Sequence, residues 1–425
     1  MTIAIITFLS LFSFILIGIP ISIAIGLASL VGFLVNGTSL LQMVSTVASG
    51  VDSFTILAIP FFLFSGTIME KGGMSRRIVQ FAESLLCWMS GGLGHVVVIA
   101  SMFFAALSGS APATCAAIGS AMIPQMKNKG YPAEFSAALQ SVAATIGPII
   151  PPSIGMIVYG VAAGVSIGKL FAAGILPGIL YGIALMLTAG SISKKEHFGY
   201  KKPFSAGEVW RSFKDAIWAL LVPGIILGGI YTGVFTPTEA GAVAAVYAIV
   251  VCLFIYKELD LKELLHTFGQ AASNTSMVLM ILACSTAFSW IITSAGIGKL
   301  LGGWFMHITT NPTIFMALVV VLLLFMGCFL DSNAIILIIT PVLAPVATAL
   351  GIDLVHFGIV IVMVTCLGIS TPPVGENLYI AAGIAGVKFE SMVPYVIKFV
   401  IAATVICLLV AFVPQISMFL PNLIY

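Results

Sequence analysis

Charge is the scarcest feature of this 425-residue sequence. Only 8% of its residues are Asp, Glu, Lys or Arg, whereas a soluble globular protein carries about 25%. A chain with so few charges cannot cover a water-facing surface, and 60% of its residues are hydrophobic. Apolar runs such as 3–16 and 170–189 approach the ~20 residues that a membrane-spanning helix requires. The composition therefore predicts an all-α polytopic membrane protein in contact with the lipid bilayer.

Several chemical signatures are also missing. The net charge of +2 is too small to suggest a nucleic-acid partner, and no GxxxxGK[ST] motif offers an ATP site. The seven cysteines form no CxxC pair, so we expect free core thiols and neither disulfides nor a metal site. The sequence contains no HExxH motif and no pair of Asp residues in matching spans, so it lacks the catalytic residues that would suggest an enzyme. Energy for any work therefore has to come from an ion gradient or from a partner protein.

The apolar runs predict the order of the spans. They fall near 3–35, 52–70, 134–166, 170–192, 216–234, 237–256, 268–292, 354–381 and 395–416. No Lys or Arg precedes the first run, so we interpret it as two short spans broken at Gly18-Ile19-Pro20 and not as a signal peptide. We expect the polar insert 193–215 to be a cytoplasmic loop with a short amphipathic helix. Residues 1–425 are thus predicted to form one transmembrane unit.

Basic residues predict the orientation, because cytoplasmic loops are enriched in Lys and Arg. Four basic clusters occur, and the predicted spans place all four on the same side, which we expect to be the cytoplasm. Their members are Lys71, Arg76 and Arg77; Lys127 and Lys129; Lys194, Lys195, Lys201, Lys202, Arg211 and Lys214; and Lys257 and Lys262.

Region 91–126 does not have the pattern of plain spans. Its middle, Ser108-Gly109-Ser110-Ala111-Pro112, is a helix breaker. The return arm, residues 113–125, would be roughly 20 Å long as a helix, whereas a hydrocarbon core is about 30 Å thick. Both ends of the region carry the cytoplasmic signature. We therefore expect a re-entrant hairpin that enters and leaves by one face.

An internal repeat emerges when the chain is shifted by 221 residues. The shift pairs Ser110 with Asp331, Pro124 with Pro345, Gly147 with Gly368, and Pro151-Pro152 with Pro372-Pro373. These matching breakers predict a second re-entrant hairpin in 312–350, and the five predicted spans between the hairpins place its opening on the opposite face. Residues 91–166 and 312–381 are therefore predicted to be inverted repeats, each a hairpin followed by a broken helix. Secondary transporters typically have this architecture.

The two broken helices predict cation sites. Their prolines and glycines cannot continue a helix, and carbonyls freed within lipid need partners. Neighbouring helices, hydroxyls, water or Na+ can serve, and a simple proline kink is the alternative interpretation. Because the breaks are duplicated, we expect at least two sodium sites built from oxygen ligands. The first comprises Ser108, Ser110, Gly147, Pro148 and Pro151, and the second comprises Gly327, Asp331, Gly368 and Thr371.

Asp331 lies between strongly apolar segments, where an ionisable group by default marks function. The alternative role is an N-cap for the helix that begins at Ser332, and both roles can coexist. The half-helices that start after each break direct their positive ends toward the membrane midplane, which favours a substrate carboxylate. We expect polar substrate contacts from Ser110, Thr114, Ser153 and Asn333.

Four motifs follow one another along the chain. They are Ser108-Gly109-Ser110 with Gly119, residues 147–153 (GPIIPPS), residues 235–240 (FTPTEA) and residues 368–375 (GISTPPVG). In this order they resemble the large membrane subunit of tripartite ATP-independent periplasmic (TRAP) transporters. The resemblance implies an elevator-type fold of the ion-transporter superfamily in the bacterial inner membrane. It also implies sodium-coupled symport of an organic acid, of the sialic acid or four-carbon dicarboxylate class, into the cytoplasm.

The resemblance implies two partners, a small four-helix membrane subunit and a periplasmic substrate-binding protein that largely selects the substrate. We expect this chain to be the unfused form. The main alternative is a stand-alone dicarboxylate or anion carrier of the same superfamily; a channel and an intramembrane peptidase are the alternatives from other classes. Glu376 departs from the family pattern, because an uncharged residue is expected after the Pro-Pro-Val-Gly turn. The polarity of the second site therefore stays open.

Overall fold

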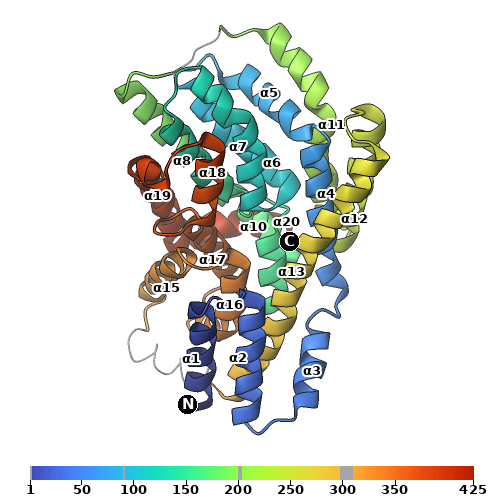
Figure 1. The fold of residues 1–425 in the computed structure, drawn as a ribbon, viewed down its shortest axis with the longest axis vertical. Coiled ribbons are helices and arrows are strands. Elements are labelled where there is room, and N and C mark those ends of the chain that lie inside the picture. The colour runs from blue at the N-terminus through green and yellow to red at the C-terminus, as the bar shows by residue number, and fades with distance from the viewer. Residues whose placement is uncertain (1, 90, 200–202, 297–309) are drawn as a thin grey trace.

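The structure, a computed structural model, describes residues 2–89, 91–199, 203–296 and 310–425 (Figure 1). Within these ranges every regular element is a helix, as the composition predicts. Seven helices of the described chain are long and apolar enough to cross a membrane, and all seven cysteines are buried with no disulfide among them. Lys201 and Lys202, two of the predicted cytoplasmic cations, lie outside the described residues.

One group of helices, here called the scaffold, flanks the first repeat in the sequence. It consists of α1 (Thr2–Leu16), α2 (Ile21–Val35), α3 (Leu40–Ser49), η1 (Phe54–Leu57), α4 (Ala58–Lys71), α11 (Ala206–Tyr231), α12 (Pro237–Val250), its π-helical extension η3 (Val251–Ile255) and α13 (Leu261–Ser294). Within it α4 packs against α12 and α13, and α2 packs against α1 and α13. Gly18 separates α1 from α2 with φ of +88°, which confirms the predicted break in the first apolar run. The helix α5 (Met74–Leu86) joins the scaffold to the first repeat.

The polar insert differs from its prediction. Residues 206–215 are the first turns of α11, continuous with its membrane-spanning part, and do not form a separate amphipathic helix. The Ser205 hydroxyl caps α11 by accepting the backbone N–H of Glu208 at 3.4 Å. No Gly or Pro interrupts residues 208–222, so nothing in the sequence stops the helix between the polar and the apolar part.

The two predicted repeats contain the same helices in the same order. The first has α6 (Gly92–Ser108), α7 (Ala111–Asn128), α8 (Ala133–Ala143) with the 3-10 turn η2 (Ala144–Ile146), α9 (Ile154–Ala163) and α10 (Ile167–Lys195). The second has α15 (Pro312–Gly327), α16 (Ser332–Ala349), α17 (Leu354–Gly368), α18 (Glu376–Ala385) and α19 (Phe389–Phe412), followed by α20 (Pro414–Ile424). The start of α6 at 92 and of α15 at 312 differ by 220, and the starts of α10 at 167 and α19 at 389 differ by 222. The offset of 221 residues therefore describes a repeated structure.

The return arm of the first hairpin is longer than predicted. It is α7, with 18 residues and a length of about 27 Å, and not the expected 13-residue helix. Pro112 lies in the first turn of α7, where proline removes no helical hydrogen bond. Pro124 lies inside α7 without ending it. The length of this arm is therefore no evidence for a re-entrant hairpin. The evidence is the position of the hairpin tip, which ends at the broken helix described below.

Two hydrogen bonds show that the repeats are inverted. At the open end of the first hairpin, the Lys127 ammonium donates to the carbonyl of Ala385, the last residue of α18, at 2.7 Å. Near the far end of α9, the Tyr159 hydroxyl donates to the carbonyl of Leu354, the first residue of α17, at 2.7 Å. The first broken helix thus ends on the face where the second one begins, and the second ends on the face where the first hairpin opens. The two hairpins open to opposite faces.

The segments that carry the basic clusters gather at one end of the molecule, the upper end in Figure 1, where α5, the end of α7 and the start of α11 lie. Side-chain contacts join the loops that carry them: Arg76 and Arg77 contact Glu258 at 2.6 and 2.8 Å, Gln125 contacts Glu83 at 3.0 Å, and Ser84 contacts Ser212 at 2.7 Å. Below, this end is called the basic face. The first hairpin opens toward the basic face, which the enrichment of basic residues in cytoplasmic loops predicts to be the cytoplasmic one.

Candidate functional site

The tip of the first hairpin touches the break in the first broken helix. α6 ends at Ser108, and Gly109 follows with φ of +61°, a left-handed conformation that reverses the chain. The Gly109 carbonyl accepts the N–H of Ile154 at 3.4 Å, and a Cβ on Gly109 would lie 2.6 Å from the carbonyl oxygen of Pro152. Only glycine fits this contact. We call the meeting of tip and break the first junction.

Buried oxygens gather at the first junction. The Thr114 hydroxyl donates to the Ser110 carbonyl at 2.7 Å and lies 3.1 Å from the Ser108 hydroxyl. A Cβ on Gly147 would lie 2.8 Å from the Ser110 carbonyl oxygen and 2.9 Å from the Thr114 hydroxyl. Ser108, Ser110 and Gly147 therefore come together as predicted, and Thr114, predicted to contact substrate, belongs to the same group. Uncharged hydroxyl and carbonyl oxygens are the ligands that a hard cation such as Na+ accepts.

The remaining residues of the predicted first site have other partners. The Ser153 hydroxyl donates to the Pro148 carbonyl at 2.5 Å and accepts the N–H of Met156 at 3.1 Å. Ser153 is thus the N-cap of α9, and the Pro148 carbonyl is already used within the break. Pro151 makes no hydrogen bond to the Ser108–Thr114 oxygens in the described structure. Pro148 and Pro151 shape the break, and their role as sodium ligands stays a prediction, because a carbonyl that accepts one hydrogen bond keeps a second lone pair.

The second junction is built in the same way around two glycines. A Cβ on Gly368 would lie 2.5 Å from the Cα of Gly327, and a Cβ on Gly327 would lie 2.7 Å from the Cα of Gly368. The N–H of Gly375 donates to the Cys328 carbonyl at 3.4 Å, so the second hairpin tip also rests on its break. The N–H of Thr371 donates to the Gly368 carbonyl at 2.8 Å. Of the four residues predicted for the second sodium site, Gly327, Gly368 and Thr371 are therefore in direct contact.

Asp331, the fourth, lies on the same tip and is the N-cap of α16. One carboxylate oxygen accepts the N–H groups of Asn333 at 3.0 Å and Ala334 at 3.3 Å. The capping role is therefore confirmed, and it leaves room for a cation role. Asn333, predicted to contact substrate, lies in the first turn of α16. Glu376 begins α18 directly after Gly375, whose N–H contacts the second hairpin tip, so the second junction carries two carboxyl groups.

Four buried polar residues were missed by the sequence analysis. They are Gln140 and Ser141 on α8, Ser370 in the second break and Asn377 on α18. The Gln140 amide donates to the Thr114 carbonyl at 3.1 Å. The Ser141 carbonyl accepts the Ser370 hydroxyl at 2.8 Å. A polar side chain inside an apolar span is itself a functional signal, and this signal was available in the sequence.

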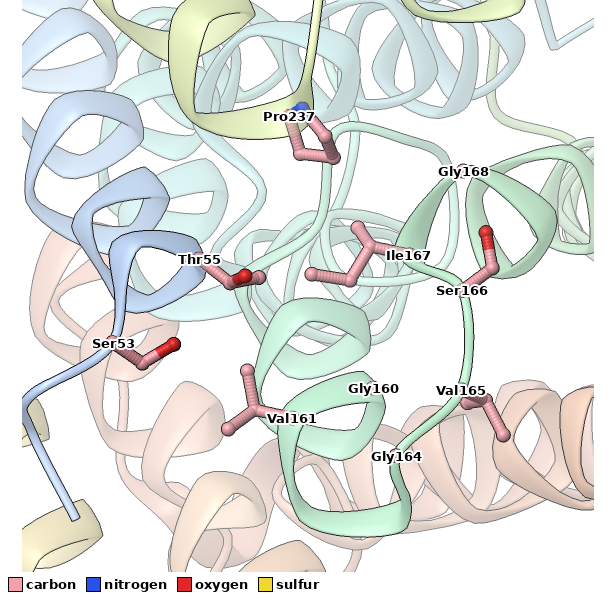
Figure 2. A pocket seen from close by; sticks show the side chains of 10 residues that line it. All are labelled: Ser53, Thr55, Gly160, Val161, Gly164, Val165, Ser166, Ile167, Gly168 and Pro237. Atoms are coloured by element: carbon pink, nitrogen blue, oxygen red, sulfur yellow. The ribbon is translucent and has the colours of Figure 1, made fainter. Parts of the chain in front are cut away.

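Two cavities lie between the scaffold and the repeats, on the face opposite the basic face. The larger has a volume of 430 Å³ and separates the α9–α10 link from η1 and from Pro237 at the start of α12 (Figure 2). The smaller has 220 Å³ and reaches Leu337 and Pro341 of α16. They share Ser53 and Val161, and none of their lining residues is charged. None of the predicted substrate contacts Ser110, Thr114, Ser153 and Asn333 lines either cavity.

Comparisons with known proteins agree with this architecture. A family profile described as "Tripartite ATP-independent periplasmic transporter, DctM component" matches residues 8–416. The chain is 38% identical to the C4-dicarboxylate TRAP transporter large permease protein DctM of Rhodobacter capsulatus, with 99% of each chain covered. It is 37% identical to the sialic acid TRAP transporter large permease protein SiaM of Vibrio cholerae, covering 96% of this chain and 95% of that one. Among solved structures, the YdaH transporter of Alcanivorax borkumensis superposes with a TM-score of 0.70 over 90% of each chain at 13% identity, which shows a shared fold.

Proposed function

Because the chain belongs to the DctM family of tripartite ATP-independent periplasmic transporters, as a large permease and not an enzyme, we propose that it imports an organic acid by sodium symport. The observation that carries the sodium proposal is the first junction. There the hairpin tip brings two hydroxyl oxygens and one carbonyl oxygen within hydrogen-bonding distance of one another, and Gly147 of the broken helix packs directly against them. A second junction with a carboxylate on its tip supports a second sodium ion.

The substrate class follows from relatives and from the two half-helices. Two relatives are named for C4-dicarboxylates and sialic acid, both of which are carboxylic acids. α9 begins at the first junction with Ser153 as its cap, and α18 begins at the second. The N-terminal end of a helix favours a negative charge, so a substrate carboxylate is stabilised between the junctions. We assign Ser110, Thr114, Ser153 and Asn333 to this binding region.

Transport is proposed to follow an elevator mechanism, in which the repeats move against the scaffold. The two groups already meet closely at the first junction, because a Cβ on Gly66 of α4 would lie 3.1 Å from the Cα of Ser108. The proposed partners are a small four-helix membrane subunit and a periplasmic binding protein, in the bacterial inner membrane. The tripartite composition in the family's description supports this assembly.

Uptake into proteoliposomes tests the proposal. The chain, its small membrane subunit and its binding protein are reconstituted, and labelled succinate and sialic acid are offered under an inward sodium or potassium gradient. We expect accumulation of one acid class with sodium only, and only when the binding protein is added. Equal uptake with potassium would refute sodium coupling. Uptake without the binding protein would favour the stand-alone carrier.

The elevator proposal predicts a distinct effect of Gly66→Ala. The added methyl group would press on the first hairpin tip, and overpacking of this kind costs about 1 kcal/mol or more. If the activation free energy of transport rises by about 1.4 kcal/mol, uptake slows roughly tenfold. Because Ser108 belongs to the proposed first sodium site, thermal stabilisation by sodium is measured alongside: slowed uptake with wild-type stabilisation indicates the sliding contact, whereas lost stabilisation indicates a displaced tip. Gly241→Ala is the matched control, because its Cβ would lie 3.0 Å from the Cβ of Phe61 within the scaffold. Equal slowing in both variants would contradict sliding at this contact.

A further inference from the structure

A continuous polar connection links the two junctions through the protein interior. It starts at Thr114 of the first junction, whose carbonyl accepts the side-chain amide of Gln140 at 3.1 Å. The next residue of α8, Ser141, offers its carbonyl to the Ser370 hydroxyl at 2.8 Å and to the Asn377 amide at 3.4 Å. The Asn377 amide also donates to the Ser370 hydroxyl at 3.1 Å.

The connection ends in the backbone of the second break. The N–H of Asn377 donates to the carbonyl of Ile369 at 3.1 Å, and Ile369 directly follows Gly368 of the second junction. Each step is therefore a hydrogen bond or a single covalent step along the chain. A chain of contacts thus runs from Thr114 at the first junction through α8 to the backbone beside Gly368 at the second.

Helix packing alone does not require these polar residues. Gln140, Ser141, Ser370 and Asn377 are all 0% exposed, and the side-chain oxygens of Gln140 and Asn377 have no hydrogen-bond partner among the described residues. A buried acceptor without a partner is costly, so a purely structural role would be served better by apolar side chains.

The internal repeat supplies the comparison. A shift of 221 residues pairs Gln140 with Ile361, Ser141 with Val362, Ser370 with Ile149 and Asn377 with Met156. All four counterparts are apolar and fully buried. At each of these four positions, one repeat has a polar residue and the other an apolar one. The fold itself therefore does not require a polar side chain there.

We propose that Gln140, Ser370 and Asn377 are positioning residues that couple the two junctions, so that two sodium ions bind cooperatively. This inference rests on the proposed sodium sites. Binding at the first junction orders Thr114 and, through Gln140 and Ser141, fixes the second break in its ion-binding arrangement. By linkage, an ion at the second junction strengthens binding at the first by the same factor.

Thermal unfolding of the purified full chain tests the coupling. The unfolding temperature is followed as NaCl replaces choline chloride at constant ionic strength, because a ligand that binds the folded state raises it. The stabilisation is fitted to the two-site form of RT ln(1 + [L]/Kd), and for two coupled sites we expect the fitted occupancy to be sigmoidal in sodium concentration, with a Hill coefficient between 1 and about 2. The variants are Gln140→Ile and Asn377→Met, which carry the side chains that the other repeat uses at the paired positions.

Both variants should fold, keep sodium stabilisation, and show a Hill coefficient of about 1. Ser136→Ala is the matched control, since its buried hydroxyl bonds only to Pro132 at the start of its own helix, and it should retain the wild-type curve. A wild-type Hill coefficient of 1, variants that match a sigmoidal wild type, or the same loss in Ser136→Ala would each overturn the coupling. A wild type that sodium does not stabilise would instead refute the proposed sodium sites.

Discussion

Asp331→Asn is expected to remove sodium binding at the second junction while leaving the helix cap intact. Asn caps a helix as well as Asp does, so the N–H groups of Asn333 and Ala334 keep an acceptor. Only the negative charge is lost. We expect sodium affinity to fall by at least about tenfold, or about 1.4 kcal/mol, and sodium-driven uptake to approach background. Asp331→Ala should add the loss of the cap, a further destabilisation of about 1 kcal/mol.

Asp353 provides a control with the same local geometry. Its carboxylate accepts the N–H groups of Val355 at 2.7 Å and His356 at 3.2 Å, so it caps α17 as Asp331 caps α16. It lies at the start of α17, at the opposite end of that helix from Gly368 of the second junction. Asp353→Asn should therefore leave sodium stabilisation and uptake unchanged. If Asp331→Asn behaves like Asp353→Asn, then Asp331 is a cap and nothing more.

Gly147→Val is expected to disrupt the first junction. Gly147 has φ of −46° and ψ of −57°, which any residue adopts, so the effect is steric and not conformational. The first added carbon would lie 2.8 Å from the Ser110 carbonyl oxygen and 2.9 Å from the Thr114 hydroxyl, and both oxygens would have to move. Overpacking costs typically 1–3 kcal/mol, and the displaced atoms are the proposed ligands. We expect loss of sodium-driven uptake together with a lowered unfolding temperature in sodium.

Gly155 separates the specific effect from general crowding. It lies one residue inside α9, and a Cβ there would meet its nearest neighbours, Ile336 and Val362, at 3.5 Å, an ordinary contact distance. Gly155→Ala should be tolerated, whereas Gly147→Ala should already weaken sodium stabilisation. Normal uptake by both Gly147 variants would show that the Ser110 and Thr114 oxygens are not sodium ligands.

The breaks and their duplication could be predicted because they are caused by the glycine and proline residues at the breaks themselves. Gly109, Gly147 and Gly368 stand where backbones approach too closely for a side chain, and the paired prolines stop a helix wherever they occur. Such residues act on their own neighbours, so their effect is visible along the sequence. The same reasoning located both hairpin tips and the contacts among Ser108, Ser110 and Gly147.

The remaining features depend on contacts between distant residues. Asn377 reaches Ser141 across 236 positions and Ser370 reaches it across 229, and no periodicity reports such a pairing. The length of α7 was underestimated because Ala111-Pro112 was assigned to the helix breaker and Lys127 to a loop, whereas α7 includes all three residues. The hydrogen bond from the Ser153 hydroxyl to the Pro148 carbonyl could not be predicted either, because it depends on how the chain folds within the break.

The interior position of every native thiol has a practical consequence. All seven cysteines are buried, so the wild-type surface offers little to a thiol-reactive probe. A single cysteine introduced at an exposed position, such as Lys388 beside α18, would then be the main group that a spin label or fluorophore modifies. With a second label on the scaffold, and with the native cysteines unlabelled, distances between the repeats and the scaffold could be recorded during a transport cycle.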